Sequence, residues 1–143
     1  MKFGLQIKPE DCSLLGLEIL KYMESTGLSM RKLASQAGIT HPGLRVIILK
    51  GGNPTKSNII KLARVMGKHP TELYQLVCED KLRAMAEPGA IDVLMRAFDD
   101  ILKTFCKLAG QLPEDKRPSE YELLDKTLKT IKSFQEETQQ MSS

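Results

Sequence analysis

The chain has 143 residues, and its 41% hydrophobic and 27% charged residues are usual for a globular domain with its own core. We expect neither a membrane span nor a secretory signal, because no run of about 18 apolar residues occurs and the N-terminus lacks a signal-like pattern. The three cysteines are odd in number and widely spaced, so reduced thiols, a cytoplasmic location and no metal site are expected.

The net charge of +3 is unevenly distributed along the chain. Residues 1–77 carry 11 Lys and Arg against 5 Asp and Glu, a net charge of +6. Residues 78–143 carry 10 against 13, a net charge of −3. A basic first half joined to an acidic second half indicates two separate roles, with any polyanionic partner on the first half.

Five helices are predicted between residues 13 and 86, because apolar residues recur at three- and four-residue intervals and strand-like alternation is absent. Ser29 and Thr40 are suitable N-caps for the second and third helices, and Gly38 between them suits a left-handed C-terminal position. Pro42 is compatible with a first helical turn, where its missing N–H would have no helical partner. The predicted ranges are 14–25, 30–37, 41–50, 57–67 and 71–86.

Two further amphipathic helices are predicted after the Pro88-Gly89 break. Residues 90–110 carry a stripe of large apolar residues at helical spacing, and residues 119–134 carry a second stripe that begins with a Ser119-x-x-Glu122 capping box. The polar segment between them is expected to be a turn, which makes the pair a helical hairpin. The tail from residue 135 onward is expected to be frayed or disordered.

The second and third predicted helices have the spacing of a helix-turn-helix. Ala34 is small where two helices must cross, and Gly38 supplies the positive φ of the turn. Ile39, Leu44 and Ile47 are expected to bury against Leu33 and so to fix the crossing of the two helices.

The wider string GLSMRKLASQAGITHPGLRVIILKGGNPTKSNIIKLARVMGKHPTEL resembles the lambda-repressor/Cro-like family, also called the xenobiotic-response-element type. The resemblance covers about residues 14–77. It implies an all-α fold with a five-helix DNA-binding domain. With the break at Pro88-Gly89 as its boundary, we expect this domain at residues 1–87 and a C-terminal helical dimerisation region at residues 88–143. In that family His69 occupies a helix-capping position.

The resemblance also implies which residues contact double-stranded DNA. In that family the third helix lies in the major groove, and dimers read palindromic sites. By position, the base-reading candidates are His41, Gly43 and Arg45, and Arg45 can contact guanine in a bidentate way worth about 1–3 kcal/mol of discrimination. Thr40 caps the helix near a phosphate. The other candidate backbone contacts are Arg31, Lys32, Lys50, Asn53, Lys56 and Ser57.

Several residues depart from the family pattern. Met30 replaces a glutamine that usually binds a phosphate, and Pro42-Gly43 removes two positions that often contact bases. Val46, Ile48 and Leu49 stand where polar residues are usual. Two interpretations remain open: the bare glycine allows a close approach of the backbone, with Val46 at a thymine methyl group, or the apolar face is a protein-contact surface.

The two C-terminal stripes must be covered, and a five-helix unit of this type is already closed. We expect a homodimer, because burying large apolar side chains is worth roughly 1.5–3 kcal/mol each before entropy costs. The alternatives are packing within one chain, with Leu17 and Leu20 as the receiving surface, or a ligand pocket between the helices. The residues expected at the dimer interface are Leu94, Phe98, Ile101, Leu102, Phe105, Leu124, Leu128 and Ile131.

The sequence offers no nucleophile beside a base and no Gly-rich phosphate loop, so we expect no catalytic residues, no enzyme activity and no cofactor. It favours a cytoplasmic, bacterial or phage-encoded transcription regulator, either repressor or activator. The alternative is a helix-turn-helix interaction module, such as a phage adapter or an antitoxin, with a protein partner at its C-terminal helices.

Overall fold

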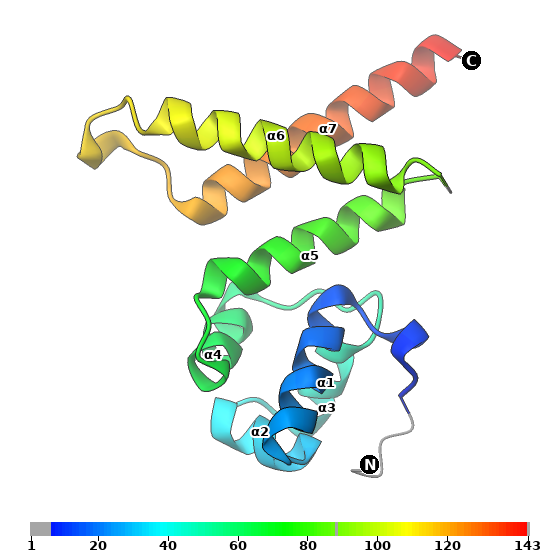
Figure 1. Ribbon diagram of the computed structural model, residues 1–143, viewed down its shortest axis with the longest axis vertical. Coiled ribbons are helices and arrows are strands. Elements are labelled where there is room, and N and C mark those ends of the chain that lie inside the picture. The colour runs from blue at the N-terminus through cyan, green and yellow to red at the C-terminus, as the bar shows by residue number, and fades with distance from the viewer. Residues whose placement is uncertain (1–6, 88, 143) are drawn as a thin grey trace. The chain divides into compact units, whose positions relative to one another are not determined.

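The computed structural model describes residues 7–87 and 89–142, and over these residues the fold is all-α (Figure 1). The only extended pairing within these two ranges is a single antiparallel bridge between Cys12 and Leu49. The chain divides into two compact units, Met1–Asp80 and Lys81–Ser143. The division falls inside a helix, before the Pro88-Gly89 break on which the sequence-based boundary rests.

The first unit contains a short 3-10 helix and most of five α-helices. These are η1 (Pro9–Asp11), α1 (Leu14–Thr26), α2 (Met30–Ala37), α3 (His41–Ile48), α4 (Lys56–Met66) and α5 (Pro70–Met85). The second unit takes the end of α5 and adds a hairpin. Its elements are α6 (Ile91–Ala109), η2 (Glu114–Lys116) and α7 (Glu120–Ser142).

Hydroxyl side chains begin the first four helices. Each accepts a hydrogen bond from the backbone N–H three residues later, one of the donors that a helix start leaves without a partner. The capping residues of α1 to α4 are Ser13, Ser29, Thr40 and Thr55. His69 precedes α5, and its Nδ1 accepts from the backbone N–H of Thr71 at 3.2 Å, which confirms its capping position.

The core of the first unit forms where α1 and α2 pack against α3 and where α2 packs against α4. Leu33 and Leu44 are fully buried, and Ala34 is 2% exposed, as the predicted helix crossing requires. Other side chains that close this core are Leu15, Ile19, Ile48, Ile59, Leu62 and Leu73. Met30 is also buried at 3% exposure, so it belongs to the core and does not face a phosphate.

In the second unit α6 and α7 pack against each other and bury Phe98, Leu124 and Ile131. The predicted capping box is present, because the backbone N–H of Glu122 donates to Ser119 Oγ at 3.2 Å. The prediction of a frayed or disordered tail is wrong for the described residues, since α7 continues to Ser142. The segment after Phe134 contains no Gly or Pro and is rich in Glu and Gln, which are good helix formers.

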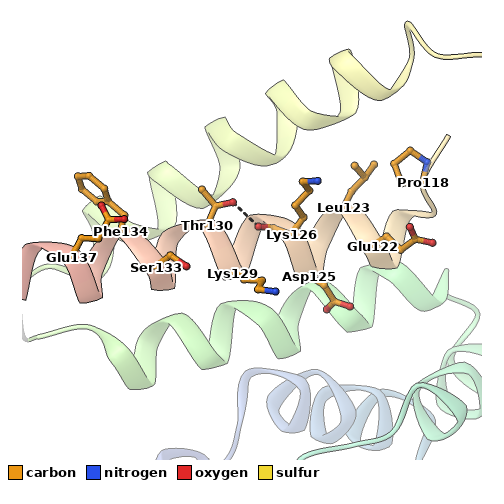
Figure 2. Close-up of a pocket in the computed structure, with 10 residues that line it drawn as sticks. All are labelled: Pro118, Glu122, Leu123, Asp125, Lys126, Lys129, Thr130, Ser133, Phe134 and Glu137. Carbon is orange, nitrogen blue, oxygen red and sulfur yellow. Dashed lines mark hydrogen bonds between the residues drawn. The ribbon is translucent and has the colours of Figure 1, made fainter. Parts of the chain in front are cut away.

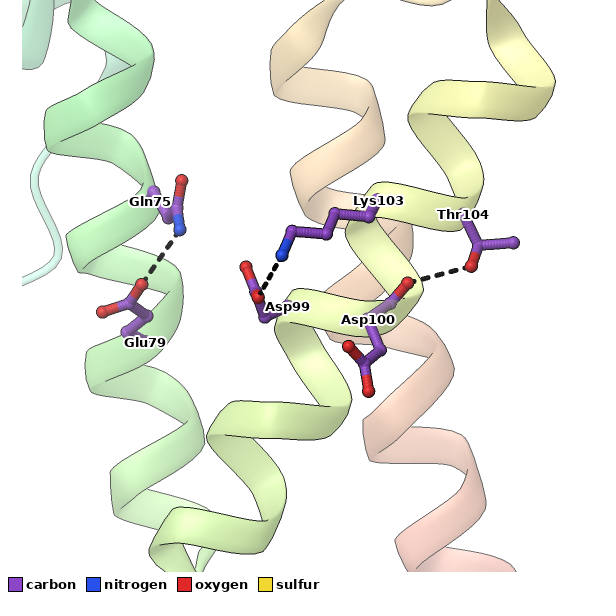
Figure 3. A network of polar contacts seen from close by, with 6 residues as sticks. All are labelled: Gln75, Glu79, Asp99, Asp100, Lys103 and Thr104. Carbon is purple, nitrogen blue, oxygen red and sulfur yellow. Dashed lines mark hydrogen bonds and ion pairs between the residues drawn. The ribbon is translucent and has the colours of Figure 1, made fainter.

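Polar side chains pair one helical turn apart on α5 and α6 (Figure 3). Lys103 Nζ lies 2.9 Å from Asp99 Oδ2, and this hydrogen bond and charge raise the pKa of Lys103. Gln75 donates to Glu79 at 3.1 Å in the same i,i+4 arrangement on α5. The exposed Lys103–Asp99 pair adds little to stability because solvent screens it, whereas Gln75 and Glu79 are half-buried.

Candidate nucleic-acid interface

A tight turn joins α2 to α3. Gly38 adopts φ 75°, and the backbone N–H of Ile39 returns to the carbonyl of Ala34 at 2.9 Å. A left-handed residue costs little only when it is glycine, so the turn depends on Gly38. With Leu33 and Leu44 buried between the helices, α3 is held rigidly and its opposite face is free to contact a partner.

The first turn of α3 explains why glycine occupies position 43. Thr40 Oγ1 accepts from the backbone N–H of Gly43 at 3.0 Å, which caps the helix. A Cβ atom on Gly43 would lie 2.7 Å from the same oxygen and would push the cap aside. The glycine therefore has a structural reason within the chain. The sequence alone offered only the interpretation that it lets the backbone approach DNA.

The exposed face of α3 brings two of the base-reading candidates together. His41 and Arg45 are exposed and lie four residues apart, which places them on one helix face. Gly43 is half-buried. Val46, the next residue after Arg45, is 56% exposed, so an apolar side chain stands on the outer surface beside the arginine.

The end of α3 differs from the predicted range of 41–50. The helix stops at Ile48, and Leu49 takes an extended conformation with φ −79° and ψ 153°. The cause is contact with the chain before α1, because Cys12 pairs with Leu49 and the N–H of Lys50 donates to the Asp11 carbonyl at 2.9 Å. Lys50 is exposed and lies in the loop after the helix.

The remaining phosphate candidates flank α3 on two helices and a loop, and all are exposed. Arg31 and Lys32 lie in the first turn of α2, and Asn53 lies in the loop before α4. Lys56 and Ser57 begin α4. The Lys56 ammonium stands 5.5 Å from the centre of the Tyr74 ring, a cation–π distance that orients this side chain.

Over residues 7–87 and 89–142 no three or more His, Cys, Asp or Glu side chains form a group that could hold a metal ion. Cys12 and Cys78 are buried and Cys106 is exposed, and all three are reduced. Burial and the nearby Asp11 carboxylate raise the pKa of the Cys12 thiol, so it remains protonated near neutral pH.

A groove of about 810 Å³ follows one face of α7 (Figure 2). It is lined by basic and acidic side chains, among them Lys126, Lys129 and Glu137, with Leu123 and Phe134 as its large apolar groups. Its lining residues are Pro118 and residues of α7, with none from α6, so this groove is not the pocket between the two helices that the alternative requires.

No helix in the described part of the chain combines the length and apolar character that crossing a membrane requires. This finding concerns residues 7–87 and 89–142 only.

Residues 19–73 match the helix-turn-helix family model of the lambda-repressor/Cro-like type. The match confirms the resemblance for these residues, and it includes every DNA-contact candidate from Arg31 to Ser57. It does not extend to α6 and α7. The family consists of DNA-binding regulatory domains and is not typically enzymatic, so DNA binding and transcription regulation are the class of activity that the match supports. No curated protein and no solved structure matches the chain.

Proposed function

We propose that this protein is a sequence-specific transcription regulator that binds palindromic double-stranded DNA as a homodimer. One observation carries the proposal. The exposed face of α3, with His41 and Arg45 one turn apart, is held rigidly inside a segment that matches a DNA-binding family. In this geometry α3 enters the major groove and the first turn faces the base edges.

Direct reading of bases rests on few side chains. Arg45 donates two hydrogen bonds to a guanine, and His41 reaches a neighbouring base edge. The exposed Val46 lies against a thymine methyl group. Because Gly43 contributes no side chain, the remaining specificity comes from phosphate contacts and from the shape of the DNA.

Binding strength comes mainly from phosphate contacts on either side of α3. Each Lys or Arg that neutralises a phosphate adds about 0.9 to the slope of log affinity against log salt concentration. Asn53 and Ser57, together with Thr40 at the helix start, add uncharged contacts. The basic contacts are Arg31, Lys32, Lys50 and Lys56, which are all exposed.

The hairpin supports dimerisation because part of its apolar stripe stays uncovered in one chain. Leu94, Phe98, Ile101, Phe105 and Leu108 follow one another along α6 at intervals of four and three residues, the spacing of a coiled-coil seam. Phe98 is buried within the hairpin, but Leu94, Ile101 and Phe105 are half-buried. Leu108 is 54% exposed, and Leu112, in the turn after α6, is 43% exposed. A second copy of the hairpin would cover these exposed and half-buried side chains.

The other expected interface residues divide between two roles. Phe98, Leu124 and Ile131 are buried in the single chain, so we assign them to the core of the hairpin. Leu102 and Leu128 are half-buried, and we assign them to the border between that core and the second copy.

Duplex binding by the full chain tests the DNA proposal. Fluorescence anisotropy with a labelled random-sequence duplex should show binding at low salt that weakens steeply as KCl rises. The double variant Arg45→Ala/Lys50→Ala should bind more weakly and with a smaller salt slope, because it lacks two cationic groups. Negligible wild-type affinity at low salt, together with no effect of the double variant, would contradict the proposal.

One observation favours a second candidate function. Val46 is exposed on α3 and Ile60 is 39% exposed on α4, so apolar groups lie on the outer surface of the helix-turn-helix unit. An interaction module, a phage adapter or an antitoxin, would use such groups to bind a protein. The anisotropy measurement separates the two candidate functions, since the interaction module requires no salt-dependent affinity for DNA.

Under the DNA-binding proposal, the protein acts in the cytoplasm and is encoded by a bacterium or a phage.

A further inference from the structure

The segment that precedes α1 lies across the end of α3. We call residues 9–13 the N-terminal strap. Cys12 forms the antiparallel bridge with Leu49, and the N–H of Ser13 donates to the Ile48 carbonyl at 2.9 Å. On the other side of the bridge, the N–H of Lys50 donates to the Asp11 carbonyl at 2.9 Å. The strap therefore binds backbone groups both at the end of α3 and just after it.

The hydroxyl of Ser13 joins two helix ends. It accepts a hydrogen bond from the N–H of Gly16 at 2.8 Å, which caps α1. The same hydroxyl is within donor distance of two carbonyls in the last turn of α3, Ile47 at 3.2 Å and Ile48 at 3.3 Å. The last carbonyls of a helix have no partner inside it, so a buried side chain that donates to them closes the helix. Ser13 is only 6% exposed.

Two further contacts hold the strap in place. A Cβ atom on Gly16 would lie 2.0 Å from the Ile48 oxygen, so the close approach of α1 to α3 requires glycine. The N–H of Leu14 donates to Asp80 Oδ1 at 3.3 Å, which ties the start of α1 to α5. The end of α3 is thus fixed by contacts with residues more than thirty positions earlier in the chain.

We propose that the N-terminal strap positions the end of the recognition helix, with Ser13 as a positioning residue, so that Lys50 and the loop leading to Asn53 face the DNA backbone. This inference rests on the proposed DNA-binding function. Apolar periodicity alone would continue α3 to Lys50, whereas the strap holds Leu49 extended and turns Lys50 out of the helix.

The salt dependence of DNA binding by the full chain tests the positioning role. Ser13→Ala should lower the salt slope by about 0.9, the value for one phosphate contact, because Lys50 loses its fixed position. Ser13→Thr keeps the hydroxyl and should restore the slope. In a Lys50→Ala background, Ser13→Ala should change the slope no further. An unchanged slope, or an equal further drop in that background, would overturn the proposal.

Ser119→Ala is the matched control. Ser119 is also a helix-capping serine whose hydroxyl both accepts from a backbone N–H and lies within donor distance of another oxygen, but it begins α7 outside the matched segment. It should leave the salt slope unchanged. A drop equal to that of Ser13→Ala would show that any lost cap has the same effect, and would also overturn the proposal.

Amide hydrogen exchange of the wild-type protein without DNA tests the strap separately from the proposed function and needs no variant. The Lys50 amide lies outside the helix, yet it should exchange as slowly as the amides of α3 because it donates to Asp11. Rapid exchange at Lys50 would refute the strap. If Lys50 is protected and the wild type binds no DNA, the proposed function fails while the strap stands.

Discussion

The two units of the chain bury their apolar side chains to very different degrees. In Met1–Asp80, residues from five helices reach zero or near-zero exposure, including Leu33, Leu44 and Ile59. In Lys81–Ser143, the hairpin buries Phe98 and a few partners but leaves much of a heptad-spaced stripe half-buried or exposed. The first unit therefore covers its apolar side chains within one chain, whereas the second leaves apolar surface that the proposed dimer would cover.

The two halves of the chain also differ in net charge. Residues 1–77 carry a net charge of +6 and include every DNA-contact candidate, whereas residues 78–143 carry −3. An acidic hairpin gains nothing from a phosphate backbone, so its contribution to the proposed function is to pair two DNA-binding units.

Removing residues 88–143 should have the largest effect, because it removes the whole proposed dimer interface. We expect a monomer by light scattering, since the truncated chain loses the α6 seam. Affinity for a palindromic duplex should fall by about 100-fold or more, because two linked binding units gain that much from effective concentration. A truncated chain that remains dimeric would place the interface in the first unit and refute the role of the hairpin.

Truncating one apolar side chain in each unit tests how differently the two units bury such groups. Leu33→Ala should lower the free energy of unfolding by about 2–5 kcal/mol, because Leu33 is fully buried and a cavity would remain. Phe134→Ala, on the 65% exposed side chain of α7, should change it by no more than about 0.5 kcal/mol. Urea denaturation of both variants at one protein concentration provides the measurement. Equal effects would mean that the second unit is as fully packed as the first.

A pair of glycines gives the smallest expected effect. Gly16→Ala should destabilise the protein by about 1–3 kcal/mol, because its Cβ would overlap the Ile48 carbonyl. At Gly110 in the second unit, a Cβ would meet its nearest atom at 3.4 Å, so Gly110→Ala should be close to neutral. The thermal unfolding midpoints of the two variants measure this difference. A neutral Gly16→Ala would mean that α1 and α3 are not held as closely as described.

Most of the first unit could be predicted from the sequence because its signals are local. Capping residues such as Ser29 and Thr40, and Gly38 in the turn, act on neighbours within four residues, so short patterns identify them. The burial of Leu33 and Leu44 also follows from spacing within α2 and α3. These local signals located the helix-turn-helix and its exposed face.

The features that the sequence did not predict depend on distant contacts or on weak local signals. The end of α3 is set by Ser13 and the strap, which no pattern around Ile48 reveals. The reason for Gly43 is the position of a hydroxyl in three dimensions. Burial of Met30 reflects the packing of α2 within the core. The polar end of α7 has helix-forming residues, but its low apolar content led to the prediction of a frayed tail.

Selection of bound duplexes from a random pool by the full-length protein tests the central claim most directly. The proposed function predicts enrichment of a two-fold symmetric sequence, with a guanine in each half-site whose preference is lost in Arg45→Ala. If the folded protein enriches no sequence from the pool at low salt, the proposed function is contradicted.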